Sequence, residues 1–139
     1  ARRETLEAAI AIARRDPPRL VAGNVVDVLP AIAAQAPPEA TLVVVNTNVL
    51  PYFSAAERAR YAAVLEAIGA TRDLAWVAVE WPAYALEAGF RGSFEGIEMP
   101  SPALPLTLTT FERGTRRDEV LAVTGPHGRW LRWLPPPGA

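Results

Sequence analysis

The sequence contains no cysteine, no lysine, a single histidine and no glycine-rich phosphate-binding loop. Without cysteine, the chain can form neither a disulfide bond nor a thiolate metal site. All 14 basic residues are arginine, so the chain has no lysine to act as a Schiff-base nucleophile or to contact a phosphate group. The lone His127 has no companion ligands at a metal-binding spacing, and we predict no metal site.

The sequence also has little net charge and no long hydrophobic run. The net charge is −1 and the charges are well mixed, which argues against nucleic-acid binding. No apolar run approaches the length of a membrane span, so no membrane partner is expected. With 139 residues, 50% of them hydrophobic, the chain can form one domain with a sizeable core. A cytoplasmic bacterial protein is the simplest expectation, although a lack of cysteine fits other compartments too.

The spacing of apolar residues predicts three helices, at residues 2–15, 25–36 and 54–69. The second contains Pro30, where we expect a kink. The third is the best specified, because Ser54 and Glu57 form an S-x-x-E capping box at its start. Gly69 is predicted to end this helix as the glycine that follows its last helical residue.

The remaining periodic segments predict strands. The run at residues 41–46 is continuously apolar, which is typical of a strand covered on both faces in a parallel sheet. Near the C-terminus, alternating residues and a connecting turn predict an antiparallel hairpin. Residues 81–103 have little periodicity and are predicted as a long loop or lid, and residues 135–139 as a flexible tail. The predicted strands are residues 19–22, 41–46, 74–80, 104–112, 119–124 and 129–134.

Helices that alternate with strands predict a single α/β domain over residues 1–139. In open α/β sheets, ligands bind beyond the carboxyl ends of the parallel strands. Polar and aromatic residues follow two of the predicted strands. They are Asn46, Thr47 and Asn48 after the first, Tyr52 in the turn that follows, and Glu80 and Trp81 after the second.

We predict that Asn46, Thr47, Asn48, Tyr52 and Trp81 bind a substrate. Glu80 and Asn48 are the candidate catalytic residues, because a carboxylate beside Asn48 could act as a general base or orient a substrate amine. Structural alternatives exist for each. The asparagines can cap the strand-to-helix turn, Tyr52 can pack beside the helix, and Glu80 can pair with one of the arginines.

Four segments carry a family resemblance: residues 43–50 (VVVNTNVL), 57–61 (ERARY), 74–80 (LAWVAVE) and 125–131 (GPHGRWL). They resemble the C-terminal part of a bacterial family known only as a conserved domain of unknown function, whose members are larger. The order of elements is similar to the second half of a class I methyltransferase-like Rossmann domain. The resemblance implies a partial Rossmann-like sheet, in which parallel strands are followed by an antiparallel C-terminal hairpin and helices pack on the sheet.

The resemblance also implies a cofactor, S-adenosylmethionine, for the intact protein. Methyltransferases bind it through a glycine-rich loop after strand one and an acidic residue after strand two, and this chain has neither. We therefore expect the C-terminal half of a larger domain, with no cofactor bound by this chain alone. Asn24 is the one residue in the position of an adenine contact, and helix capping explains it as well.

These observations leave several functions open. In the first, the intact protein is an S-adenosylmethionine-dependent methyltransferase of a small molecule, and this chain alone is inactive. In the second, the chain is a non-catalytic Rossmann-like module for binding or assembly. A third makes it a complete small α/β domain of another family. The strand at residues 19–22 lacks its neighbours in the methyltransferase sheet, so we expect a rearranged sheet or a homodimer through exposed strand edges.

Overall fold

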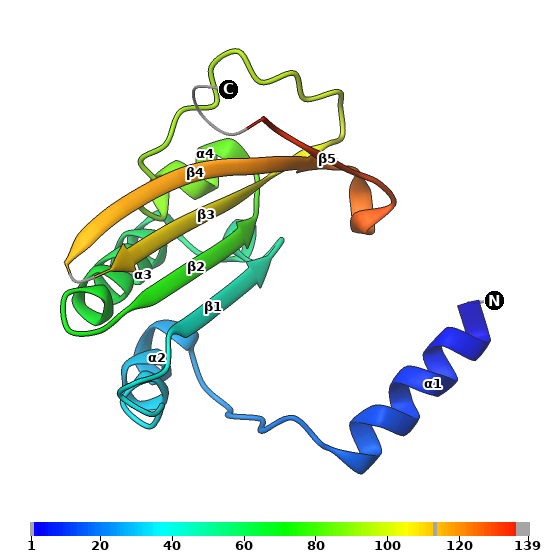
Figure 1. The fold of residues 1–139 in the computed structure, drawn as a ribbon, viewed down its shortest axis with the longest axis vertical. Coiled ribbons are helices and arrows are strands. Elements are labelled where there is room, and N and C mark those ends of the chain that lie inside the picture. Colours follow the sequence, from blue (N-terminus) through cyan, green and yellow to red (C-terminus); the bar gives the residue numbers. More distant parts are fainter. Residues whose placement is uncertain (1, 113, 136–139) are drawn as a thin grey trace.

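The computed structural model describes residues 2–112 and 114–135, which form a five-stranded sheet with helices (Figure 1). Among these residues, no helix has the length and apolar character needed to cross a membrane. The elements in chain order are α1 (Arg2–Arg15), α2 (Val25–Ala33), β1 (Leu42–Thr47), η1 (Leu50–Tyr52), α3 (Ala55–Gly69), β2 (Leu74–Val79), α4 (Pro82–Glu87), β3 (Leu104–Glu112), β4 (Thr115–Thr124), η2 (Pro126–Gly128) and β5 (Leu131–Trp133).

The five strands lie side by side in their chain order, β1-β2-β3-β4-β5. Only β1 and β2 are parallel, and every later pair is antiparallel. The fold is therefore mixed α/β, with the predicted antiparallel hairpin formed by β3 and β4. The register places Val44 beside Trp76, and Trp76 beside Thr109.

The prediction of a strand at residues 19–22 is wrong. These residues have no helical or strand structure, and Leu20 is 89% exposed. A strand needs a neighbour for its backbone hydrogen bonds, and this short segment after Pro17-Pro18 has none. As a result β1 is the edge strand, and the prediction that it is covered on both faces inside a parallel sheet is wrong, because its face with Val43 and Val45 is exposed.

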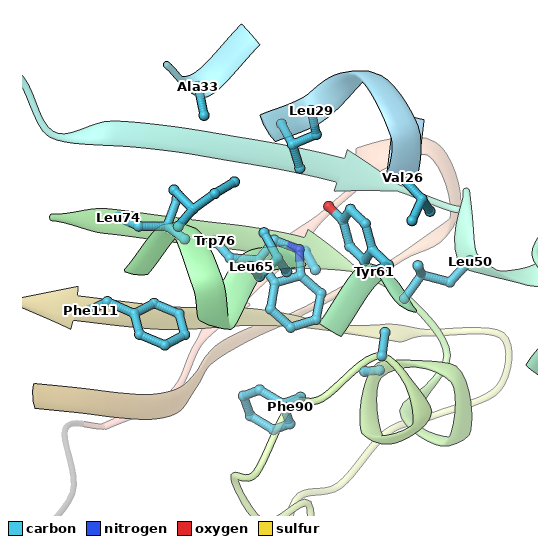
Figure 2. Close-up of a cluster of buried hydrophobic side chains, with 14 residues drawn as sticks. Val26, Leu29, Ala33, Leu50, Tyr61, Leu65, Leu74, Trp76, Phe90 and Phe111 are labelled. Carbon is cyan, nitrogen blue, oxygen red and sulfur yellow. The ribbon is translucent and has the colours of Figure 1, made fainter. Parts of the chain in front are cut away.

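The core lies on one face of the sheet, where side chains of α2, α3 and α4 form one cluster with those of β2 and β3 (Figure 2). Trp76 is at its centre, 2% exposed, with its ring edge-to-face against Tyr61 at 6.0 Å. Burial alternates along β2, so that Leu74, Trp76 and Ala78 face this core.

The predicted capping box at the start of α3 is confirmed. Ser54 accepts a hydrogen bond from the backbone N–H of Glu57, and the Glu57 carboxylate accepts one from the backbone N–H of Ser54. The predicted role of Gly69 is wrong, because Gly69 is the last helical residue and Ala70 continues in a right-handed conformation. Gly69 instead lies against the Phe111 ring, where a β-carbon would overlap the ring atoms.

Residues 81–103, predicted as a long loop or lid, contain helix α4. Pro82 occupies the first turn of this helix, a position that needs no backbone N–H. Ala85 and Ala88 are fully buried in the core cluster, and Phe90 is 2% exposed. The chain from Gly89 to Ala103 has no further helix or strand. In the predicted tail, Pro135 is exposed and residues 136–139 lie outside the described residues.

Helix α1 forms as predicted but stands apart from the sheet (Figure 1). Its side chains from Arg3 to Arg15 are all exposed, including Leu6 at 60% and Ile10 at 41%. Residues 16–24 join it to α2. The apolar stripe that identifies this helix in the sequence thus has no core beneath it.

Candidate functional site

The carboxyl ends of β1 and β2 bring together two of the predicted site residues. The parallel register aligns Thr47 with Val79, so Asn46 lies near the end of β1 and Glu80 directly follows β2. The Asn46 side-chain amide donates a hydrogen bond to Glu80 Oε1 at 2.7 Å. The two residues are 34 positions apart in the chain, and their contact joins the two strand ends.

Glu80 is 1% exposed and binds the backbone of the turn after β1. Its Oε1 also accepts hydrogen bonds from the backbone N–H of Val49 at 2.8 Å and of Leu50 at 3.3 Å. Its Oε2 is buried and has no hydrogen-bond partner among the described residues. The partners of Oε1 are therefore an amide and two backbone groups, rather than the arginine that the sequence offers as an alternative.

Asn46 continues this network into the core. Its Oδ1 accepts hydrogen bonds from Trp76 Nε1 at 2.5 Å and from the Tyr61 hydroxyl at 3.3 Å. Burial of Tyr61, together with the nearby Glu80 carboxylate, raises the pKa of the Tyr61 hydroxyl. Asn46 thus points toward α3 and β2, and its two polar atoms serve the fold.

Four of the predicted residues form an exposed rim at this edge of the sheet: Thr47, Asn48, Tyr52 and Trp81. Tyr52 is 87% exposed and Trp81 is 45% exposed. Asn48 has a positive φ of 51°, a backbone conformation that asparagine tolerates better than most residues. Its backbone N–H donates to the carbonyl of Val79 at 3.0 Å, which keeps the turn close to β2.

Arg58 supports the same turn, and the sequence analysis missed it. This side chain is buried on α3 and donates hydrogen bonds to the backbone carbonyls of Leu50, at 3.1 Å, and of Phe53. It also pairs with Glu87 at 2.6 Å and lies 4.7 Å from the centre of the Tyr84 ring. Its spacing on the buried face of α3, three residues before Tyr61, is the signal that could have identified it.

A second polar group, partly buried and also missed, lies away from the rim on β3 and β4. Asp118 accepts hydrogen bonds from the Thr109 hydroxyl and from Arg116 Nε, each at 2.7 Å. Burial raises the pKa of the Asp118 carboxyl, but the bonds from Arg116 and Thr109 outweigh it and hold that pKa below its usual value. Arg116 also pairs with Glu66 of α3, so this group joins the helix to the sheet.

Asn24 lies at the start of α2, apart from the strand ends. Its side-chain oxygen accepts a hydrogen bond from the backbone N–H of Val26 at 3.0 Å, and its amide donates to Glu57 at 3.1 Å. A cavity of about 1040 Å³ lies between α2 and α3, but none of the predicted site residues lines it. The candidate site is therefore an exposed edge rather than an enclosed pocket.

The exposed side chains at this edge are of types that can contact a ligand. Two exposed ring systems, Tyr52 and Trp81, can stack on a flat ligand, and Asn48 can donate and accept hydrogen bonds. Glu80 Oε2 accepts no hydrogen bond from the described residues, but it is buried and is not exposed at this edge. Among the described residues, no group of three or more acidic or histidine side chains could hold a metal ion.

Comparisons with known proteins place the chain in a family. No curated protein matches it, and no solved structure matches it. A family model described as an uncharacterized protein conserved in bacteria (DUF2332) matches residues 1–133. This match confirms the bacterial family of unknown function that the four sequence segments predicted. The chain therefore belongs to DUF2332, a family of uncharacterised proteins conserved in bacteria.

Proposed function

We propose that this chain is the substrate-side part of a methyltransferase-like domain, and that the intact protein transfers a methyl group from S-adenosylmethionine to a small molecule. The observation that carries this proposal is the contact between Asn46 and Glu80 at the ends of two parallel strands. This contact holds the exposed rim at the sheet edge where open α/β folds bind ligands.

In this proposal the rim and the buried pair have different roles. Asn48, Tyr52 and Trp81 contact the substrate, because their side chains are exposed. Asn46 is a positioning residue, since both its polar atoms are bound within the protein. Glu80 is a positioning residue as well, since it is 1% exposed and its Oε1 holds the backbone of the turn.

The described residues alone do not fit S-adenosylmethionine. The sequence has no glycine-rich loop, and Asn24 already uses both its side-chain oxygen and its amide within the fold. We therefore propose that other parts of the intact protein supply most contacts to the cofactor. No step of the reaction is assigned to this chain beyond binding and orientation of the substrate.

Calorimetric titration with S-adenosylhomocysteine tests this proposal. The full-length protein should bind it with a micromolar Kd, whereas this chain alone should give no heat. Trp81→Ala in the full-length protein should leave that affinity unchanged, because Trp81 is assigned to the substrate. The absence of binding by the full-length protein would overturn the methyltransferase proposal.

A second candidate function, assembly, is favoured by a separate observation. Edge strand β1 carries Val43 and Val45, which are 55% and 63% exposed. Its six residues, LVVVNT, include no charge and no proline, the features with which proteins usually protect a sheet edge. We propose that this side of the sheet is covered by another protein surface.

A further inference from the structure

The face of the sheet opposite the core presents a group of branched apolar side chains. The register places Val45 beside Val77 and Val77 beside Leu108, with a second row in which Val79 adjoins Leu106. All of these alternate with core-facing residues, and each is at least partly exposed. We call them the bare-face patch, which comprises Val43, Val45, Val77, Val79, Leu106 and Leu108. In the described part of the chain, the helices of the core cluster lie on the other face.

The same chain contains a second apolar surface without a core beneath it. On α1, Leu6, Ala9, Ile10 and Ala13 share one side of the helix at spacings of three and four residues. A helix of 14 residues is only marginally stable in water unless such a stripe packs on something. The stripe and the bare-face patch are thus two exposed surfaces of the kind that α/β proteins bury against each other.

The two surfaces match in size and in charge. The patch spans three strands spaced about 4.8 Å apart, so it is roughly 10 Å wide. That is about the width of one helix, and α1 is roughly 21 Å long. Neither the four stripe residues nor the patch residues are charged, and Arg3, which lies at the N-terminal end of the stripe three residues before Leu6, is paired with Glu7. One copy of α1 can therefore cover one patch.

The position of α1 favours the patch of a different copy. Residues 16–24 leave α1 beyond the β1 edge of its own sheet (Figure 1). They include Pro17-Pro18, which stiffens the segment and keeps it extended. The segment reaches up to roughly 30 Å when extended, far enough to place α1 on a neighbouring molecule.

We propose that two copies of this chain exchange α1 helices, so that each helix covers the bare-face patch of the other copy. This inference rests on the assembly role proposed above and identifies the partner as a second copy of this chain. A third of the side of such a helix is about 240 Å². Two helices on two patches then bury about 1,000 Å², the size of a weak, reversible interface. The exchange is two-fold symmetric and closes at a dimer.

Cysteine cross-linking tests which molecule α1 covers, because the chain has no cysteine of its own. An Ile10→Cys chain is mixed with a Val45→Cys chain under oxidised glutathione. A linked pair at twice the 15.0 kDa chain mass is expected. Ala8→Cys, on the opposite side of α1, should link to Val45→Cys far less. At concentrations where the chain is dimeric, a chain carrying both Ile10→Cys and Val45→Cys should form a disulfide-linked dimer. A disulfide closed within one molecule under these conditions would mean that α1 covers its own sheet, and would overturn the exchange.

Sedimentation equilibrium separates this exchange from other modes of assembly. The unmodified chain should form a dimer with a micromolar Kd, and Leu6→Glu/Ile10→Glu or Val45→Glu should each weaken it at least about tenfold. Mixing these two variants should restore part of the affinity, since one intact helix then meets one intact patch. Ala8→Glu should have no effect. A dimer that survives both sets of substitutions would overturn the exchange but keep the assembly role, whereas a chain that stays monomeric would overturn both.

Discussion

Glu80→Ala should strongly destabilise the domain, because one carboxylate oxygen accepts three hydrogen bonds at the candidate site. The donors are the Asn46 amide and the backbone N–H groups of Val49 and Leu50. Alanine leaves all three without this acceptor. The bond to Leu50 is buried, so water cannot replace it, while the other two donors are partly buried.

The expected loss of folding free energy follows from the number of hydrogen-bond donors left without an acceptor. An unsatisfied buried donor costs about 1–3 kcal/mol, and the partly buried ones lie toward the lower end. The three together give about 4 kcal/mol. Removing the buried carboxylate also removes its desolvation cost, which offsets part of this loss. The remainder is still a large share of the roughly 5–15 kcal/mol that stabilises a typical domain.

Glu80→Gln separates the hydrogen bonds from the charge. Its carbonyl oxygen can accept the same three bonds, but they lose the assistance of a charge, so we expect a loss of about 1–2 kcal/mol. Urea unfolding followed by tryptophan fluorescence measures both variants. Thr47→Ala, at an exposed position beside the site, is the control and should change stability by less than about 0.5 kcal/mol. The reasoning fails if Glu80→Ala loses less than about 1 kcal/mol, or if Glu80→Gln loses as much as Glu80→Ala.

Three further substitutions test the fold. Gly69→Ala should destabilise by about 2 kcal/mol in urea unfolding, because its β-carbon would overlap the Phe111 ring. Ser54→Ala removes the cap of α3 and should lower stability by about 1 kcal/mol, seen as a decrease in Tm. Asp118→Asn should destabilise at pH 7, because the bonds from Arg116 hold the pKa of Asp118 below its usual value. A carboxyl group whose pKa is lower in the folded than in the unfolded state stabilises the fold above the unfolded pKa of about 3.9, and this stabilisation is lost as the pH falls. Urea unfolding at about pH 5 and about pH 3 should therefore show a smaller stability difference between Asp118→Asn and the unmodified chain at the lower pH.

Each of these has a result that would contradict it. Gly69→Ala with unchanged stability would mean that the Phe111 ring can move aside without loss. A Ser54→Ala variant as stable as Ser54→Thr would exclude the cap as a source of stability. A stability difference for Asp118→Asn that stays constant as the pH falls would show that its carboxylate charge is not what Arg116 and Thr109 stabilise.

Local patterns in the sequence predict much of this fold. The strand of β1, the capping box of α3 and the hairpin of β3 and β4 depend on neighbours in the chain, and the structure contains all three, although β1 is covered on one face only. Predictions that depend on distant residues failed. Residues 19–22 have strand-like composition but no neighbour to pair with. Gly69 looks like a helix terminator, and its role depends on Phe111, far along the chain.

The candidate site divides in the same way. Sequence position alone places Glu80 and Asn46 at strand ends, since both directly adjoin apolar runs. The partner of Glu80 could not be chosen from the sequence, because it depends on the parallel register that aligns β1 with β2. For the same reason the sequence did not distinguish Asn46, which is bound inside, from Asn48, which is exposed.

The separation of α1 from the core has a consequence for truncation and for sequence variation in this segment. The core cluster begins at Val26, and none of the described side chains of α1 belongs to it. Truncation before Gly23 should therefore leave a chain that folds and melts cooperatively, and that serves as a minimal scaffold for engineering. If natural variants retain Leu6 and Ile10, the selection acts on the surface that α1 binds, and not on folding of the domain.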